Sequence, residues 1–332
     1  MEIIVRPAAR DEFCGGLPFN DANVNFAVAE YLGAENLAVE SVDGANKYLL
    51  GFLFREERSG LRAVYSGGRF GCSGLRSPTP GFDMRAAILR LADWCCDQHC
   101  HVLSVGTDWL FPGHILEDFW SLHRRVYLVA DMNDTVMGDK LSFGKLARRS
   151  NVSRCIANGE KNGFSTDVTD SPADVAYWHK HCHLTRLAEI GGLVWPLSFF
   201  DSIVRSGKGV LYALRAGETI LGGCFALQGA DCTELIMMST PLAALKQGAN
   251  CILTRDIYLD AAQDSVRWVN WQSSGTSGVA QFKRDWNCRE VPMRIYSRRF
   301  EGCPRISEQF LRNTFPDRFI FPYDALASEY QH

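Results

Sequence analysis

A segment near the C-terminal end of the chain holds the residues best suited to chemistry. Small hydroxyl and glycine residues follow an apolar, β-branched run, and the segment then delivers Phe282 and Lys283. Glycines let a backbone approach a ligand closely, and exposed amides in such turns attract anions or developing oxyanions. We therefore interpret Lys283, with Ser273, Ser274 and Gly275 before it, as a site that binds a phosphate or polarises a carbonyl. A glycine-rich loop with a surface lysine is the alternative interpretation.

A second concentration of charge lies over residues 145–161, where a helical pattern ends at Asn162 and Gly163. Its charged side chains are almost all cationic, and Arg149 and Lys161 are the candidate ligand-binding cations among them. A solvated helix face is the simplest explanation of such a pattern. Together with the lysine-bearing segment, however, it favours a polyanion or a phosphorylated ligand.

Two clusters of Cys and His are candidate metal ligands, at residues 95–101 and 179–183. The first has no second ligand pair at a zinc-like distance, and the second has Lys180 where a zinc-protease helix carries its glutamate base. We therefore predict no metal and interpret the thiols as small apolar core residues. The sequence contains no nucleophile elbow, no phosphate-binding P-loop and no dinucleotide-binding glycine turn.

The composition bounds the class of protein. A chain of 332 residues predicts about two domains, and 46% hydrophobic with 22% charged residues indicates a globular protein. The net charge of −3 argues against a uniformly basic DNA-binding surface. Twelve scattered cysteines fit free thiols in a reducing compartment. No apolar run reaches the ~20 residues of a membrane span, and the first residues lack a signal-peptide pattern, so we expect a cytoplasmic protein.

The hydrophobic pattern predicts two mixed α/β domains, at residues 1–135 and 136–300, followed by a C-terminal helix and tail at 301–332. The polar segment 131–139 is the expected linker. Strands are expected at 39–42, 48–54, 61–65, 102–105, 126–130, 210–215, 220–227, 233–238, 266–271 and 293–297. Helices are expected at 84–100, 145–161, 171–189, 247–262 and 306–313.

Several of these segments together resemble one known family, the Fem-type (FemABX) transferases. The basic run at 146–163 is similar to that family's glycine-ended basic helix, and the segment 273–286 is similar to its closing loop with a Phe-Lys pair. In the first half, Tyr65 begins a short Tyr-Ser-Gly-Gly run that resembles a small loop of the family. The resemblance covers residues 25–300 in order and is most specific in the second half.

The resemblance implies a fold of two tandem acetyltransferase-like (GNAT) domains and an acyltransferase that forms an amide. It implies that Lys283 contacts the phosphate end of the donor and assists transfer. Phe282, Tyr65 and the basic helix would contact substrates. The best-known members use aminoacyl-tRNA, and relatives use other acyl donors. The acyl donor would be a co-substrate, and no resident cofactor is implied.

The sequence leaves the donor and the acceptor amine open. The stretch 245–250 occupies the place of a CoA pyrophosphate loop, but it begins with Leu245 and ends with Asn250, which disfavours CoA. Direct attack of a neutral amine on an activated acyl carbon would need no enzyme nucleophile, in agreement with the missing motif. Acyl-CoA or carrier-bound donors are the second candidates, and a non-catalytic or metal-binding regulatory protein is the alternative of another class.

Overall fold

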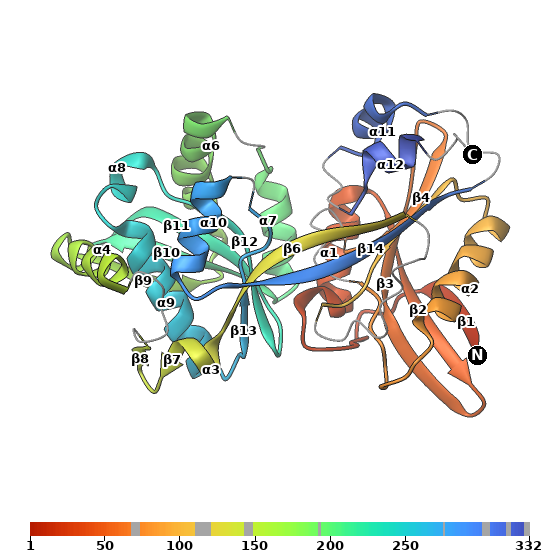
Figure 1. Ribbon diagram of the computed structural model, residues 1–332. Helices are drawn as coiled ribbons and strands as arrows, with labels where there is room; N and C mark the ends of the chain where they lie inside the picture. Colours follow the sequence, from red (N-terminus) through yellow and green to blue (C-terminus); the bar gives the residue numbers. More distant parts are fainter. Residues whose placement is uncertain are drawn as a thin grey trace. The chain divides into compact units, whose positions relative to one another are not determined.

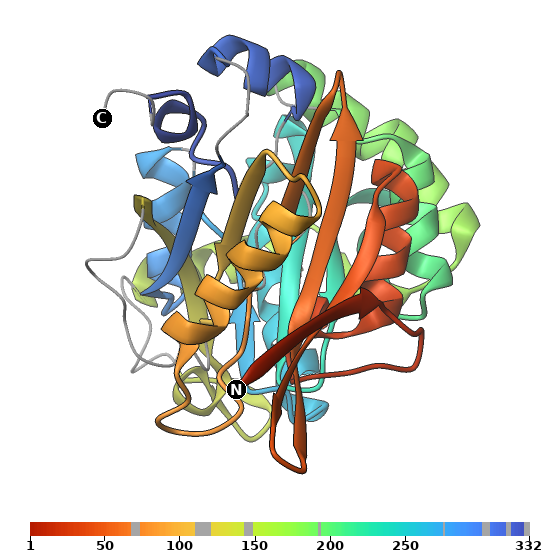
Figure 2. The same ribbon diagram turned by 90° about the vertical axis from the view of Figure 1, so that its right-hand side faces the viewer.

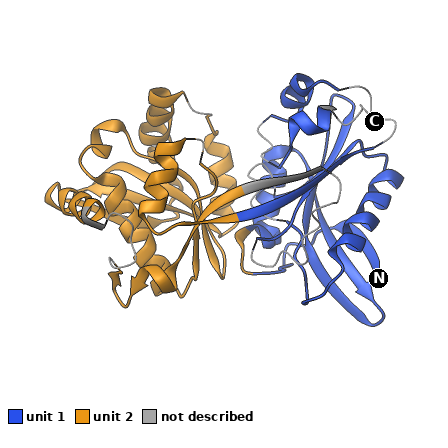
Figure 3. Ribbon diagram, in the orientation of Figure 1, with its two compact units in different colours: residues 1–15, 19–125, 292–332 blue, residues 16–18, 126–291 orange. Residues whose placement is uncertain are grey.

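The computed structural model describes residues 1–67, 74–109, 121–142, 149–191, 194–274, 276–300, 306–316 and 320–328. The chain forms two compact units (Figure 3). Unit 1 comprises residues 1–15, 19–125 and 292–332, and unit 2 comprises residues 16–18 and 126–291. The tandem α/β organisation expected from the sequence is confirmed.

Unit 1 is built on a sheet with the strand order β1-β2-β3-β4-β5-β14. Its strands are β1 (Glu2–Pro7), β2 (Glu35–Asp43), β3 (Asn46–Arg58), β4 (Leu61–Ser66), β5 (Val102–Gly106) and β14 (Arg289–Arg299, here from 292 on). Its helices are α1 (Ala22–Leu32), α2 (Met84–Asp97), α11 (Glu308–Thr314) and α12 (Tyr323–Ser328), and the short turn Pro18–Asn20 precedes α1. β1 to β4 are antiparallel, β4 and β5 are parallel, and β14 is antiparallel to β5.

Helices cover both faces of this sheet. α2 begins at Asp83, whose carboxylate caps the helix at Ala86 N, and its apolar stripe packs on β2, β3, β4 and β5. Figure 2 shows α2 lying across the strands of unit 1. A second cluster joins Ala22 of α1 to Ala38 and Phe52. Successive residues of a strand point to opposite faces of a sheet, so α2 covers one face and α1 covers the other.

Unit 2 repeats this topology with the strand order β9-β10-β11-β12-β13-β6. Its strands are β6 (Ser121–Asp131, here from 126 on), β7 (Val136–Met137), β8 (Lys140–Leu141), β9 (Phe164–Thr169), β10 (Gly209–Ala216), β11 (Thr219–Gln228), β12 (Cys232–Ser239) and β13 (Trp268–Asn270). Its helices are α3 (Met132–Thr135), α4 (Arg149–Lys161), α5 (Pro172–Trp178), a π-helix (His179–His183), α6 (Leu184–Ile190), α7 (Leu197–Arg205), α8 (Leu242–Leu245), α9 (Ala249–Gln263) and α10 (Ser277–Asp285).

Both faces of this second sheet are also covered (Figure 1). β9 to β12 are antiparallel, β12 and β13 are parallel, and β6 is antiparallel to β13. α9 packs with α4 on the face that carries Cys224 and Ala226 of β11. The alternate β11 residue, Phe225, faces Trp178 of α5 and Phe200 of α7.

The boundaries differ from the expected domains 1–135, 136–300 and 301–332. The chain passes between the units inside β6 and β14, so β14 pairs with β5 and completes unit 1. The C-terminal segment belongs to the same unit, where Ser104 Oγ donates to Ile320 O and Arg299 Nη1 to Leu326 O. The expected linker at 131–139 is instead folded into unit 2, because Asp131 caps α3 and β7 pairs with β8.

Most of the predicted elements are present, and one difference lies at residues 171–189. Ser171 caps α5 with Pro172 behind it, as expected. The helix predicted over 171–189, however, is interrupted by the π-helix before α6 begins. Of the helix predicted over 145–161, the part from Arg149 onward is present as α4, and residues 145–148 lie outside the described residues.

Candidate active site

A cavity opens in unit 2 where two strands part. β12 and β13 pair only from Cys232 to Glu234, opposite Trp268 to Asn270. β13 then ends, whereas β12 continues to Ser239. The cavity, of about 420 Å³, lies against this free part of β12 and is closed by α6, the first turn of α9, α10 and the segment after β13. Its walls therefore come from both helical layers of the unit.

Polar atoms without protein partners line this cavity. Thr240 Oγ1, Asn250 Oδ1 and Gln272 Nε2 are buried and have no hydrogen-bond partner among the described residues. Buried polar atoms in proteins are nearly always paired, since an unmade hydrogen bond costs about 1–3 kcal/mol. These three atoms are therefore suited to a polar ligand or ordered water, and they include both donors and acceptors.

Lys283 lies at the inner wall of the cavity on α10 and is only 7% exposed. Its Nζ donates to Trp271 O at 2.6 Å and Ser273 O at 3.0 Å, with a weaker 3.5 Å contact to Gln272 O. Desolvation by burial lowers the pKa of Lys283 to about 8. The ammonium group thus holds the segment after β13 in place and keeps one weakly bonded N–H for a ligand.

The segment that carries Lys283 is a helix and not an extended loop. Thr276 Oγ1 accepts a hydrogen bond from Val279 N and caps α10, so the small residues form only the entry to the helix. Phe282 lines the cavity and packs against Trp271 at a ring-centroid distance of 5.9 Å. Trp286 is fully buried behind it. The helix therefore fixes Phe282 and Lys283 by packing.

An outer hollow of about 530 Å³ shares Leu245, Asn250 and Phe282 with the cavity. Arg154 of α4 and Lys246 lie on its wall, and its described lining contains no carboxylate. α9 begins here at Gly248, without a side-chain cap. The N-terminal end of a helix carries free N–H groups and a partial positive charge, and with two cations beside it the hollow is suited to a phosphate.

The residues predicted from the sequence separate into two groups. Lys283, Phe282 and Ser273 line the cavity, and Ser274 follows them with its Oγ buried and without a partner among the described residues. Lys161 is exposed at the end of α4 and lines neither the cavity nor the hollow. Gly275 and the side chain of Arg149 lie outside the described residues.

Tyr65, predicted as a substrate-binding residue, lies in unit 1. It is fully buried on β4, where its hydroxyl donates to Glu56 Oε2 at 2.7 Å and its ring packs on Phe54 and Phe321. The structure therefore gives Tyr65 a packing role in the core of its unit. Conversely, Ser239 and Thr240 line the cavity but were not predicted from the sequence. Two consecutive hydroxyl residues at the end of a buried strand are the signal that could have identified them.

The corresponding position in unit 1 is closed by the chain itself. β4 and β5 pair over Ala63–Tyr65 and Val102–Ser104. Beyond that point Leu75 enters, with Leu75 N donating to Gly106 O and Asp108 N donating to Leu75 O. Arg76 N donates to Leu50 O of β3 on the other side. The segment therefore continues the sheet where unit 2 has its cavity.

This closure depends on Gly74, because a Cβ there would lie 2.0 Å from Gly106 O. Gly74→Ala is expected to lower the free energy of unfolding by about 1–3 kcal/mol, since backbone must move to admit the methyl group. Urea unfolding followed by tryptophan fluorescence measures the change. Gly278→Ala is the control, because nothing lies within 4 Å of that Cβ. Equal stability of the two variants would contradict the close approach.

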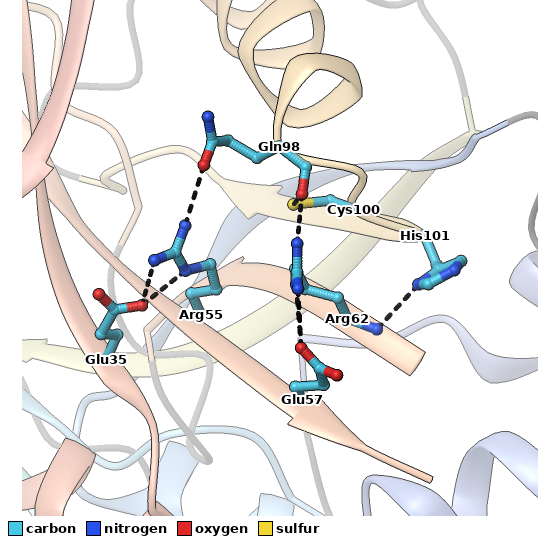
Figure 4. Close-up of polar contacts among 7 residues, drawn as sticks. All are labelled: Glu35, Arg55, Glu57, Arg62, Gln98, Cys100 and His101. Carbon is cyan, nitrogen blue, oxygen red and sulfur yellow. Dashed lines mark hydrogen bonds and ion pairs between the residues drawn. The ribbon is translucent and has the colours of Figure 1, made fainter. Parts of the chain in front are cut away.

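Of the Cys and His residues at 95–101, Cys100 and His101 lie beside a polar cluster of unit 1 (Figure 4), whereas Cys95 is part of the apolar core. His101 Nδ1 accepts from Arg62 N at 2.9 Å, and the Arg62 and Arg55 guanidinium groups pair with Glu57 and Glu35. Among the described residues, no group of three or more His, Cys, Asp or Glu is arranged to hold a metal ion. Within the same ranges, no helix is long and apolar enough to cross a bilayer.

Comparison with known proteins agrees with this geometry. Residues 147–284 match the family model of the acetyltransferase (GNAT) domain. FemX is similar in structure over 82% of this chain and 90% of its own, with a TM-score of 0.61 and 9% identity. No curated protein sequence matches the chain.

Two further solved structures resemble the chain. The C-terminal domain of a putative lysylphosphatidylglycerol synthetase from Agrobacterium fabrum matches over 82% of this chain and 86% of its own (TM-score 0.55, 10% identity). A tandem GNAT protein from the clavulanic acid biosynthesis pathway matches over 90% and 98% (TM-score 0.50, 9% identity).

The GNAT domain, with its cavity between two parting strands, defines an enzyme of the acyltransferase class. Residues 147–284 form a GNAT domain, and the fold of most of the chain is similar to those of FemX and a tandem GNAT protein, as the resemblance of its sequence implied. Acyl transfer is thus its general activity.

Proposed function

We propose that this protein forms an amide by moving an activated acyl group from a phosphate-bearing carrier to an amine. One observation carries the proposal: two spaces with different linings share a wall. The cavity is lined by Lys283 and by unpaired polar atoms, and the hollow beside it, at the start of α9, is lined by cations. The acyl end would lie in the cavity and the carrier phosphate in the hollow. A cytoplasmic location is part of this proposal.

The chemistry requires no enzyme nucleophile. The neutral amine attacks the acyl carbon, the new C–N bond forms and the bond from the acyl carbon to the carrier oxygen or sulfur breaks. The proton that the amine loses ends on the released carrier. The protein holds the two reactants in near-attack geometry and stabilises the tetrahedral oxyanion. The weakly bonded N–H of Lys283 is the donor proposed for that oxyanion, with the backbone around Ser274 beside it.

Aminoacyl-tRNA is the donor we propose first, and acyl-CoA is the second candidate. Both present phosphate, but Leu245 lines the hollow at the position where a CoA-binding loop carries a polar side chain, so it offers the pyrophosphate no donor. Radiolabelled aminoacyl-tRNA and acyl-CoA, each with a panel of amines, distinguish the two donors. Labelled amide from neither donor would contradict the proposal.

The hollow provides a matched test of where the carrier phosphate binds. Removing both cations with Arg154→Ala and Lys246→Ala is expected to raise the donor KM at least about tenfold with little change in kcat, because hydrogen bonds to charged groups contribute about 1.5–3 kcal/mol. Lys140→Ala removes an exposed lysine of β8 in the same unit and serves as the control. An unchanged donor KM in the double variant would exclude the hollow. Lys161→Ala tests the remaining sequence prediction separately.

A further inference from the structure

A π-helix lies directly beside the cavity. The five residues His179–His183 adopt this conformation between α5 and α6, and α6 then supplies Arg186, Leu187 and Ile190 to the cavity wall. π-Helices are rare and are found frequently at functional sites, because one extra residue changes which side chains face the core. In this protein the π-helix packs on β12 and places His183 against the end of that strand.

His183 is fully buried and contacts the strand end at one atom. Its Nδ1 lies 3.0 Å from Ser239 Oγ, and Ser239 lines the cavity. The rest of the imidazole is packed among rings, stacked on Trp178 at 5.3 Å and edge-on to Phe200 at 5.5 Å. Its Nε2 is buried without a hydrogen-bond partner among the described residues. Desolvation, with a smaller contribution from His179, lowers the pKa of His183 to about 4, so the ring is neutral at physiological pH.

The number of hydrogens on His183 and Ser239 limits which of the two donates the hydrogen bond between them. A neutral imidazole has one N–H and the serine has one O–H, and their mutual hydrogen bond uses only one of the two. If Ser239 donates to the ring, the remaining N–H sits on Nε2 among aromatic rings and has no acceptor. If His183 donates from Nδ1, the remaining donor is the Ser239 hydroxyl at the cavity wall. In the second arrangement the unpaired atom among the rings is the Nε2 acceptor, and buried acceptors are left unpaired more often than buried N–H groups. The remaining O–H then lies where a ligand in the cavity can accept it.

We infer that His183 holds the Ser239 hydroxyl as a fixed hydrogen-bond donor directed to an acceptor oxygen of the acyl substrate. Ser239 is then a substrate-contacting residue and His183 a positioning residue. The inference rests on the proposed function for the identity of the oxygen, which would be the carbonyl that becomes the oxyanion. A donor oriented before the substrate arrives needs no reorganisation during the reaction. Lys283 lines the same cavity from α10, so one donor comes from the end of β12 and the other from a helix.

The arrangement is tested first without any substrate. Protein labelled with [15N]histidine is examined by two-bond 1H–15N correlation spectroscopy, and the His183→Asn spectrum assigns the His183 signals. We expect a neutral ring protonated on Nδ1, unchanged from pH 8 to pH 5.5. A ring protonated on Nε2 would overturn the inference whatever the protein transfers, as would an imidazolium at neutral pH.

Kinetics provide the second test. Ser239→Ala is expected to lower kcat about 10²-fold with the donor KM within about twofold, as for loss of one oxyanion donor. His183→Leu should cause a similar loss, and the double variant should be no worse than either single variant, because the residues act as one unit. His183→Asn keeps an N–H near the position of Nδ1 and should recover most of the activity.

His181→Ala is the matched control, because this imidazole is exposed on the same π-helix. If kcat of the wild type rises with pH and this rise is lost in His183→Asn, the ring is a general base and the inference is contradicted. If Ser239→Ala forms product as fast as the wild type, this inference is refuted and the proposed function is not. If the NMR spectra show the expected tautomer but no donor yields product, only the proposed function is refuted.

Discussion

Replacing Lys283 with methionine is expected to lower kcat/KM for acyl transfer about 10²–10³-fold, the typical effect of losing one oxyanion donor. Methionine keeps much of the side-chain volume but has no N–H to offer the cavity. The expected loss is large because Lys283 is buried, and charge interactions are stronger where water is excluded. Initial rates with the productive donor and amine measure the effect, and equal rates would remove Lys283 from the mechanism.

The pH dependence of the kcat/KM ratio between wild type and Lys283→Met separates an electrostatic role of Lys283 from a structural one. The pKa of Lys283 is lowered to about 8, so the group is protonated below pH 8 and loses its charge above it. The acceptor amine titrates identically in both enzymes, and its contribution cancels in their rate ratio. The ratio of wild type to Lys283→Met should therefore fall by about tenfold per pH unit above pH 8. A ratio independent of pH would indicate that Lys283 serves only to hold the chain.

A structural contribution of Lys283 is also expected and must be measured beside the activity. The variant leaves Trp271 O and Ser273 O without their ammonium donor. Leaving buried acceptors unpaired costs about 1–3 kcal/mol, so the unfolding midpoint should decrease by several degrees. Rates are therefore compared well below the midpoint of the variant. Circular dichroism confirms that the compared enzyme is folded.

Trp286→Ala is expected to lower the free energy of unfolding by about 3–5 kcal/mol, the usual cost of emptying a large aromatic site. Trp286 is fully buried beneath α10, with ring-centroid distances of 5.7 Å to Tyr258 and 6.3 Å to Phe282. The Tyr258 hydroxyl donates to Trp286 O and accepts from Trp271 Nε1. The same residues therefore support both α10 and the segment after β13.

Thermal unfolding measures this loss, and we expect the midpoint to decrease by roughly 10 °C, at about 2–4 °C per kcal/mol. Val279→Ala is the stability control, because Val279 is on the same helix with 49% of its surface exposed. It should change stability by no more than about 0.5 kcal/mol. A midpoint for Trp286→Ala within two degrees of the control would contradict the packing role.

Local sequence signals predicted the elements well. The serine and proline at the start of α5 satisfy the first N–H groups of a helix, and their spacing is readable without the fold. The strands of both units follow apolar alternation in the same way. The π-helix at 179–183 was missed because its residues fit a regular α-helix, and only the packing of His183 among rings selects the extra residue.

The candidate site was only partly predictable, and Lys283 shows why. Its place beside Phe282 was evident from the sequence, but its three carbonyl partners depend on how the segment after β13 turns back over α10. Tyr65 shows the opposite outcome, since its partner Glu56 lies on the neighbouring strand and occupies the hydroxyl. Residue type indicates what a side chain can do, and its neighbours decide whether it is available.

The sequence by itself determined the type of most elements, the tandem α/β organisation and the segment that carries Lys283, because caps, alternation and short motifs act over a few neighbouring residues. Only the tertiary structure decided that the cavity is open in unit 2 and closed by Leu75 in unit 1. It also decided that His183 meets Ser239, 56 residues away. The cavity depends on how far two parallel strands stay together, and the His183–Ser239 contact depends on how the π-helix packs on β12. Both are set by the packing of distant segments and leave no local signal.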